Sequence, residues 1–144
     1  AHARSILKNP TLREYFSAVL EKYQHLFLEI TPASLCHEDL HKYNLLFQYR
    51  QGQWQLAAIL DFEKAWAGHH ETDLARLELW ENPLTAAFWQ AYQAICPIAP
   101  LYAQRRPIYQ LLWCLEFAQP TPAHLADTQR LCVELGLPRL ERFD

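Results

Sequence analysis

The chain is organised around one polar loop with apolar residues on both sides, which reads Leu35-Cys36-His37-Glu38-Asp39-Leu40-His41-Lys42-Tyr43-Asn44-Leu45-Leu46-Phe47. Within eight residues the loop contains a histidine, an acid and an amide in the spacing His37-x-Asp39-Leu40-x-x-x-Asn44. Polar groups held between apolar segments are costly unless they have partners or a ligand. The loop is therefore the first candidate for chemistry.

This spacing is that of the kinase catalytic loop H-x-D-L-x-x-x-N. In that loop the Asp accepts the proton of the substrate hydroxyl and the Asn holds Mg²⁺. Further along, the apolar run 57–60 leads into Asp61-Phe62-Glu63, much as a strand delivers the metal-binding Asp of the kinase D-F-G motif. Two motifs in the expected order carry more weight than one short motif, which has a high false-positive risk alone.

From Leu35 to Leu77 the chain resembles the carboxyl-terminal lobe of the aminoglycoside phosphotransferase and choline kinase-like family. The usual pattern of this family is H-G-D-L-H-x-x-N, then h-h-D-[FW]-[GE], then D-L-A. The corresponding stretches here are 37–44, 59–63 and Asp73-Leu74-Ala75, with Glu38 where the family usually has Gly. The resemblance implies an ATP- and Mg²⁺-dependent phosphotransferase that acts on a hydroxyl group of a small molecule.

The resemblance also implies roles for individual residues. Asp39 is expected to be the catalytic base, or the group that orients the acceptor hydroxyl. Asn44 and Asp61 are expected to bind Mg²⁺. His41 is a candidate contact for phosphate or substrate, while His37 and Asp73 are expected to support the loop. For Asp73, an acid favoured by the dipole at a helix N-terminus is an equally good interpretation.

The acceptor is much less clear from the sequence. Glu63, Trp66 and Glu71 are weak candidates for substrate binding, and a solvated acidic face or a core tryptophan explains them as well. The sequence does not separate an aminoglycoside from a macrolide, choline, homoserine or another hydroxylated acceptor.

Composition sets the broad class of the protein. The chain has 144 residues, of which 51% are hydrophobic and 20% charged, as in a single globular domain. A net charge of −3 argues against nucleic acid as the main partner. No apolar run approaches the roughly 20 residues needed to span a bilayer, and no signal peptide is evident. Four widely spaced cysteines indicate reduced core thiols and a cytoplasmic location.

Two features of a kinase are missing from the sequence. A Gly-rich loop over the phosphates and a strand Lys should precede the catalytic loop, yet no glycine precedes Gly52. The chain also begins with Ala and contains no Met. We therefore expect residues 1–144 to be a catalytic-loop and substrate-binding lobe. Its partner would be an N-terminal lobe of the same protein that binds ATP or GTP, and the isolated fragment should show little activity.

The expected fold class is α+β and mostly α, the carboxyl-terminal lobe of a protein-kinase-like fold with helices packed around a small hairpin. A first helix should start at a capping box formed by Thr11 and Glu14 and continue to about Phe27, with Thr31-Pro32 ending it. Strands are expected at 45–49 and 54–60, followed by an irregular loop at 63–71. Further helices are expected at 69–80, at 84–95, from Pro107 onward, and from Thr121 to Gly136.

Two alternatives stay open. One is a metal-dependent hydrolase, whose imidazole and carboxylate ligands would come from His37, Asp39, His41, His69, His70 and Asp73. The other is a non-catalytic kinase-like module that only binds a partner.

Overall fold

The structure is a computed structural model that describes residues 5–28, 33–80, 84–117 and 121–140. The chain divides into two compact units, one formed by Ala1–Ile30 with Ile98–Asp144 and the other by Thr31–Pro97. The described part is mostly helical with two small sheets, which confirms the α+β class. It contains no helix that is long and apolar enough to cross a membrane.

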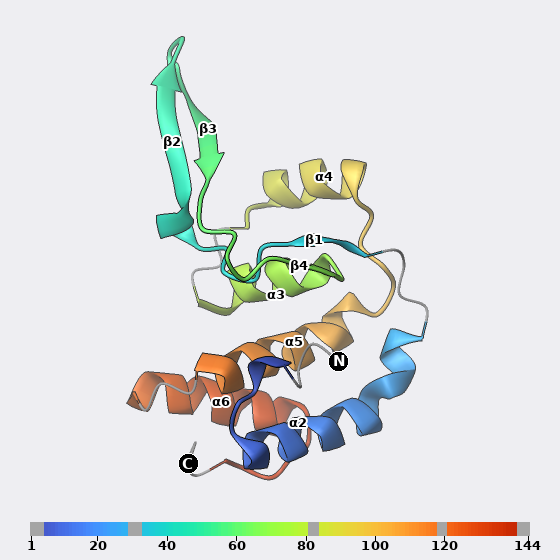
Figure 1. Cartoon of the computed structure of the whole chain (residues 1–144). Helices are drawn as coiled ribbons and strands as arrows, with labels where there is room; N and C mark the ends of the chain where they lie inside the picture. Colours follow the sequence, from blue (N-terminus) through green and yellow to red (C-terminus); the bar gives the residue numbers. More distant parts are fainter. Residues whose placement is uncertain (1–4, 29–32, 81–83, 118–120, 141–144) are drawn as a thin grey trace. The chain divides into compact units, whose positions relative to one another are not determined.

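The first unit is a helical assembly (Figure 1). It consists of helix α2 (Pro10–Tyr23), the short 3₁₀ helix η1 (Gln24–Phe27), helix α5 (Tyr102–Phe117) and helix α6 (Pro122–Glu134). Apolar side chains recur on each helix at steps of three and four, so that one face of each is buried. The core is formed by residues that are at most 2% exposed, among them Phe16, Val19, Ile108, Leu111, Leu115 and Leu131.

Two helix starts differ from expectation. Asn9, not Thr11, caps α2, because its side-chain oxygen accepts the N–H groups of Thr11 and Leu12 at 2.9 and 3.3 Å. Pro107 lies inside α5 instead of in its first turn. The helix starts at Tyr102, and in its first turn the buried guanidinium of Arg105 donates to the carbonyl of Leu26 at 3.1 Å.

The last helix was predicted correctly. The Thr121 hydroxyl accepts the N–H of His124 at 3.2 Å, which caps the start of α6. Gly136 follows the helix with a φ of 57°, where glycine has no steric penalty. Thr31-Pro32, the predicted end of the first helix, and Asn82-Pro83, between two of the predicted helices, lie outside the described residues.

The second unit contains the predicted hairpin, formed by β2 (Leu45–Arg50) and β3 (Gln53–Ile59). The strands are antiparallel, with Leu45 opposite Ile59 and Arg50 opposite Gln53. Gln51 and Gly52 have φ values of 52° and 82°, the positive pair that a two-residue hairpin turn requires. The hairpin therefore returns the end of β3 to the start of β2, where the polar loop ends.

A second sheet was not predicted. Strand β1 (Ser34–Cys36) pairs antiparallel with β4 (Trp66–Gly68), inside the segment expected to be an irregular loop. In Figure 1 this small sheet lies beside helix α3 (Glu71–Trp80), and helix α4 (Ala86–Ile95) follows. The short 3₁₀ helix η2 (Lys42–Asn44) connects the loop to β2. Pairing β1 with β4 fixes the point from which the polar loop starts.

Gly68 gives a test of this second sheet. A Cβ atom at Gly68 would overlap the indole ring of Trp66. We expect Gly68→Ala to lower the free energy of unfolding by about 1–3 kcal/mol, because the indole must leave its position. Urea unfolding measures this change. Ala67→Ser, at the exposed neighbouring position, is the control. Equal stability of Gly68→Ala and wild type would contradict the packing of Trp66.

Candidate active site

The polar loop leaves β1 at His37 in an unusual backbone conformation. Glu38 has a φ of 60°, in the left-handed region that costs an L-residue about 1–2 kcal/mol and that glycine adopts freely. This explains why glycine is common at the corresponding position of the H-G-D-L-H-x-x-N pattern, which the loop resembles. Such a loop persists only if contacts around it hold the backbone in place.

His37 connects the loop to the end of β3. Its Nδ1 accepts the backbone N–H of Asp39 at 3.1 Å, so that Nε2 carries the proton and donates to the carbonyl of Leu60 at 2.7 Å. The ring is buried and packs against Phe62, with ring centroids 4.5 Å apart. Both ring nitrogens are engaged, and the bond to Leu60 fixes the backbone next to Asp61.

Asp73 holds the loop from the first turn of α3. Its two carboxylate oxygens accept the N–H groups of His37 and Glu38 at 2.7 and 2.9 Å. Burial raises the pKa of Asp73 above its usual value of 3.8, because the loss of hydration outweighs the two backbone bonds that lower it. Asp73 is therefore both an acid in the first turn of a helix and a support of the loop.

The raised pKa of Asp73 predicts a pH dependence of stability. From about pH 3.8 upward the folded protein binds the proton more tightly than the unfolded chain. The contribution of Asp73 to the free energy of unfolding should therefore decrease as pH rises through its raised pKa. Urea unfolding between about pH 3.5 and pH 7 measures this change. In Asp73→Asn this part of the decrease should be absent, and an identical decrease in both proteins would contradict the assignment.

Asn44 lies between the loop and the hairpin. Its side-chain nitrogen donates to the backbone carbonyl of Asp39 at 3.0 Å, and its backbone carbonyl accepts the N–H of Leu60 at 2.8 Å. Asp61 follows Leu60 directly, is exposed and has a φ of 62°. The hairpin thus brings the chain positions of Asn44 and Asp61 together.

The carboxylate of Asp39 is 20% exposed and lies near an arginine and a histidine. Its Oδ1 contacts the guanidinium of Arg76, and the Nε2 of His41 lies 3.9 Å from the same oxygen. His41 Nε2 also lies 3.4 Å from the side-chain nitrogen of Asn44. Asp39, His41 and Asn44 therefore form one cluster at the end of the loop.

Arg76 is a site residue that sequence reasoning missed. Its guanidinium contacts both the Asp39 carboxylate and the backbone carbonyl of Glu38. Arg76 lies three residues after Asp73 on α3, so both side chains share one face of the helix. The signal available in the sequence was an arginine about one helical turn after Asp73, the predicted loop support.

The three weak acceptor candidates lie in different surroundings. Glu63 is exposed, whereas Trp66 is half-buried with its indole over Gly68. Glu71 is completely buried, and its carboxylate lies 3.4 Å from the Nδ1 of His69. Glu71 is therefore placed in the interior of its unit and not on an acceptor surface.

The donor atoms at the site suit a hard cation. Asn44 uses its side-chain nitrogen for the loop, which leaves its side-chain oxygen as a ligand atom, and Asp61 adds an exposed carboxylate. Mg²⁺ is typically held by one or two such oxygens together with phosphate and water. A hydrolytic zinc site needs about three His, Cys or carboxylate ligands, and the described residues contain no such group. Asn44 and Asp61 therefore offer oxygen ligands of the kind that Mg²⁺ prefers.

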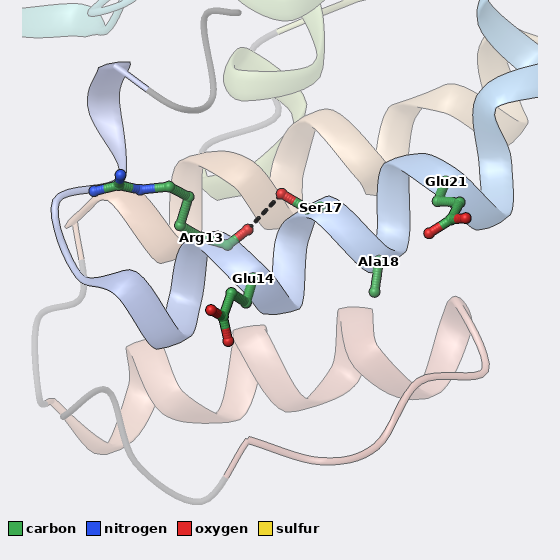
Figure 2. A pocket seen from close by; sticks show the side chains of 5 residues that line it. All are labelled: Arg13, Glu14, Ser17, Ala18 and Glu21. Atoms are coloured by element: carbon green, nitrogen blue, oxygen red, sulfur yellow. Dashed lines mark hydrogen bonds between the residues drawn. The ribbon is translucent and has the colours of Figure 1, made fainter.

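A pocket lies along α2, in the helical unit. Figure 2 shows its lining side chains on one face of the helix, with the Ser17 hydroxyl donating to the carbonyl of Arg13 at 2.8 Å. The lining residues are Arg13, Glu14, Ser17, Ala18 and Glu21. None of them belongs to the predicted site.

Comparison with known proteins places the chain in a family. The family model described as fructosamine kinase matches residues 4–134. None of the curated proteins and none of the solved structures matches the chain. Fructosamine kinases are small-molecule kinases that transfer phosphate to a sugar hydroxyl, and they belong to the protein-kinase-like phosphotransferase superfamily. This confirms the expected enzyme class, and because the match covers most of its length, the chain belongs to the fructosamine kinase family.

Proposed function

We propose that this chain is the catalytic-loop lobe of an ATP- and Mg²⁺-dependent kinase that phosphorylates a sugar hydroxyl of a fructosamine. The observation that carries the proposal is the cluster at the end of the loop: Asp39, His41 and Asn44 lie together, and the backbone of Asn44 is bonded to the residue before Asp61. The family match supports the proposed acceptor class. It favours a fructosamine over the aminoglycoside and choline acceptors that the loop motif alone suggests.

In the proposed reaction Asp39 accepts the proton of the acceptor hydroxyl. The hydroxyl oxygen attacks the γ-phosphorus in line, and the bond from this phosphorus to the leaving nucleoside diphosphate breaks. The products are a phosphate ester, a nucleoside diphosphate and a proton. Asn44 and Asp61 would hold Mg²⁺, which neutralises phosphate charge when bound. His41, whose Nε2 is 3.9 Å from the Asp39 carboxylate, would contact the transferred phosphate or the acceptor.

Acceptor recognition is assigned to the exposed acid next to the metal ligand. Glu63 follows Asp61 by two residues and is open to solvent. A fructosamine carries a basic nitrogen, and a carboxylate beside the reacting hydroxyl would favour its charged form. Trp66, half-buried three residues later, is the second candidate because its ring could pack against a sugar.

The hairpin supplies a docking surface for the proposed nucleotide-binding lobe. Large apolar side chains on both strands are 39–70% exposed, namely Leu46, Phe47, Tyr49, Trp54, Leu56 and Ile59. A two-stranded ribbon of this kind is only marginally stable alone, and a group of exposed large apolar side chains is typical of an interface. We propose that an N-terminal lobe of the same protein covers it. A non-catalytic module would use the same surface to bind a partner. A measurement of phosphoryl transfer therefore has to distinguish the kinase from the module.

The test is phosphoryl transfer by the full-length protein. The protein is incubated with Mg²⁺, with ATP or GTP, and with either a fructosamine, an aminoglycoside or choline, and the phosphorylated product is detected by mass spectrometry. We expect transfer to the fructosamine and little transfer by residues 1–144 alone. Nucleotide binding without transfer to any of the acceptors would support the non-catalytic module instead.

A further inference from the structure

The structure contains a charged contact at the site that no motif predicts. We propose that Arg76 is a positioning residue, which fixes the direction of the Asp39 carboxylate during phosphoryl transfer. This inference rests on the proposed function. Arg76 itself need not touch the substrate, because it acts through Asp39.

The guanidinium of Arg76 makes two contacts to adjacent residues of the loop. One terminal nitrogen donates to the carbonyl oxygen of Glu38 and the other to Oδ1 of Asp39. The Arg76 side chain is 6% exposed, so these contacts are shielded from water. A guanidinium is planar and presents its donors in a fixed fork, which holds both the backbone and the carboxylate in one orientation.

Helix α3 therefore holds the loop with two opposite charges. The carboxylate of Asp73 takes the N–H groups of His37 and Glu38, and the guanidinium of Arg76 takes the carbonyl of Glu38. The left-handed residue Glu38 is thus held on both of its backbone polar groups. Asp39 comes directly after it, so that a rotation at Glu38 would displace the catalytic carboxylate.

The two oxygens of the Asp39 carboxylate differ in their surroundings. Within the described ranges, the contacts of this carboxylate to Arg76 and to His41 both involve Oδ1. Oδ2 is then the oxygen that can accept the proton of the acceptor hydroxyl. Anchoring one oxygen while the other reacts provides the alignment on which phosphoryl transfer depends.

The test uses Arg76→Ala in the full-length protein. We expect kcat to fall by about 10²-fold, the effect of a displacement of roughly 1 Å at a reacting group, with the KM values for nucleotide and acceptor little changed. Added guanidinium ion should restore part of kcat in Arg76→Ala but not in Asp39→Asn. Arg76→Lys should stay impaired, because an ammonium lacks the fork. Arg130→Ala, at an exposed arginine on α6, is the matched control and should keep full activity.

Two outcomes would overturn the inference while wild-type turnover is intact. One is an unchanged kcat in Arg76→Ala. The other is a loss of activity that parallels a loss of folded protein and that added guanidinium does not restore. A readout independent of turnover is the NMR signal of the Arg76 guanidinium protons. This signal should be protected from exchange in wild type and lose part of its protection in Asp39→Ala, which removes the oxygen that accepts from Arg76. If wild type phosphorylates no acceptor, the proposed function fails, and unprotected guanidinium protons would then reject the Arg76–Asp39 contact separately.

Discussion

Asp39→Asn in the full-length protein is expected to lower kcat by about 10²- to 10⁴-fold, the usual contribution of a positioned general base. Asparagine has nearly the same shape as aspartate but cannot take up the proton of the acceptor hydroxyl. The loop should keep its conformation, because Asn44 bonds to the backbone carbonyl of residue 39 and Asp73 holds the two preceding N–H groups. Nucleotide affinity should therefore stay close to that of wild type.

Steady-state kinetics together with nucleotide titration by calorimetry separate these effects. Asp127→Asn, which removes a partly exposed acid on α6, is the matched control and should behave as wild type. Turnover at the wild-type rate in Asp39→Asn would remove Asp39 from the reaction. Loss of turnover together with nucleotide binding would instead point to a collapsed loop.

Asp61→Asn is expected to raise the Mg²⁺ concentration needed for half-maximal activity and to lower kcat by about 10²-fold at saturating Mg²⁺, equivalent to about 3 kcal/mol of lost transition-state stabilisation. The φ of Asp61 is 62°, and asparagine is among the few residues that tolerate this left-handed conformation. The substitution therefore removes the charge without straining the backbone.

A magnesium titration of the initial rate measures both effects. Because Asp61 is exposed, the folded stability of Asp61→Asn should be close to that of wild type, and thermal unfolding checks this. An unchanged magnesium requirement would show that Asp61 does not bind the metal. The same titration with Asn44→Ala should show a requirement raised in the same direction.

Local signals in the sequence predicted the hairpin and the last helix. Gly52 permits the positive φ of the turn, and Thr121 and Gly136 mark the two ends of α6, so that neighbouring residues determine each of these elements. The spacing of Asp39, Asn44 and Asp61 is likewise visible in the sequence alone, because these residues lie close to the two ends of this local hairpin. These features need no knowledge of distant contacts.

Features that depend on distant contacts were missed. Strands β1 and β4 have three residues each, too few for an alternating pattern, and they pair across the 29 residues from 37 to 65, roughly the length of a supersecondary unit. The contact of Arg76 with Asp39 likewise forms only when α3 packs against the loop. Pro107 is accepted inside α5 because packing of the surrounding helix overrides the local preference of proline for a first turn.

The most direct test of the account is a crystal structure of the full-length protein with Mn²⁺ in place of Mg²⁺ and a non-hydrolysable ATP analogue. The account predicts an anomalous signal from the cation at about 2.1 Å from the side-chain oxygen of Asn44 and from the carboxylate of Asp61, with the γ-phosphate facing Asp39. A cation bound elsewhere, or the carboxylates of Asp39 and Asp61 on separate surfaces, would contradict it.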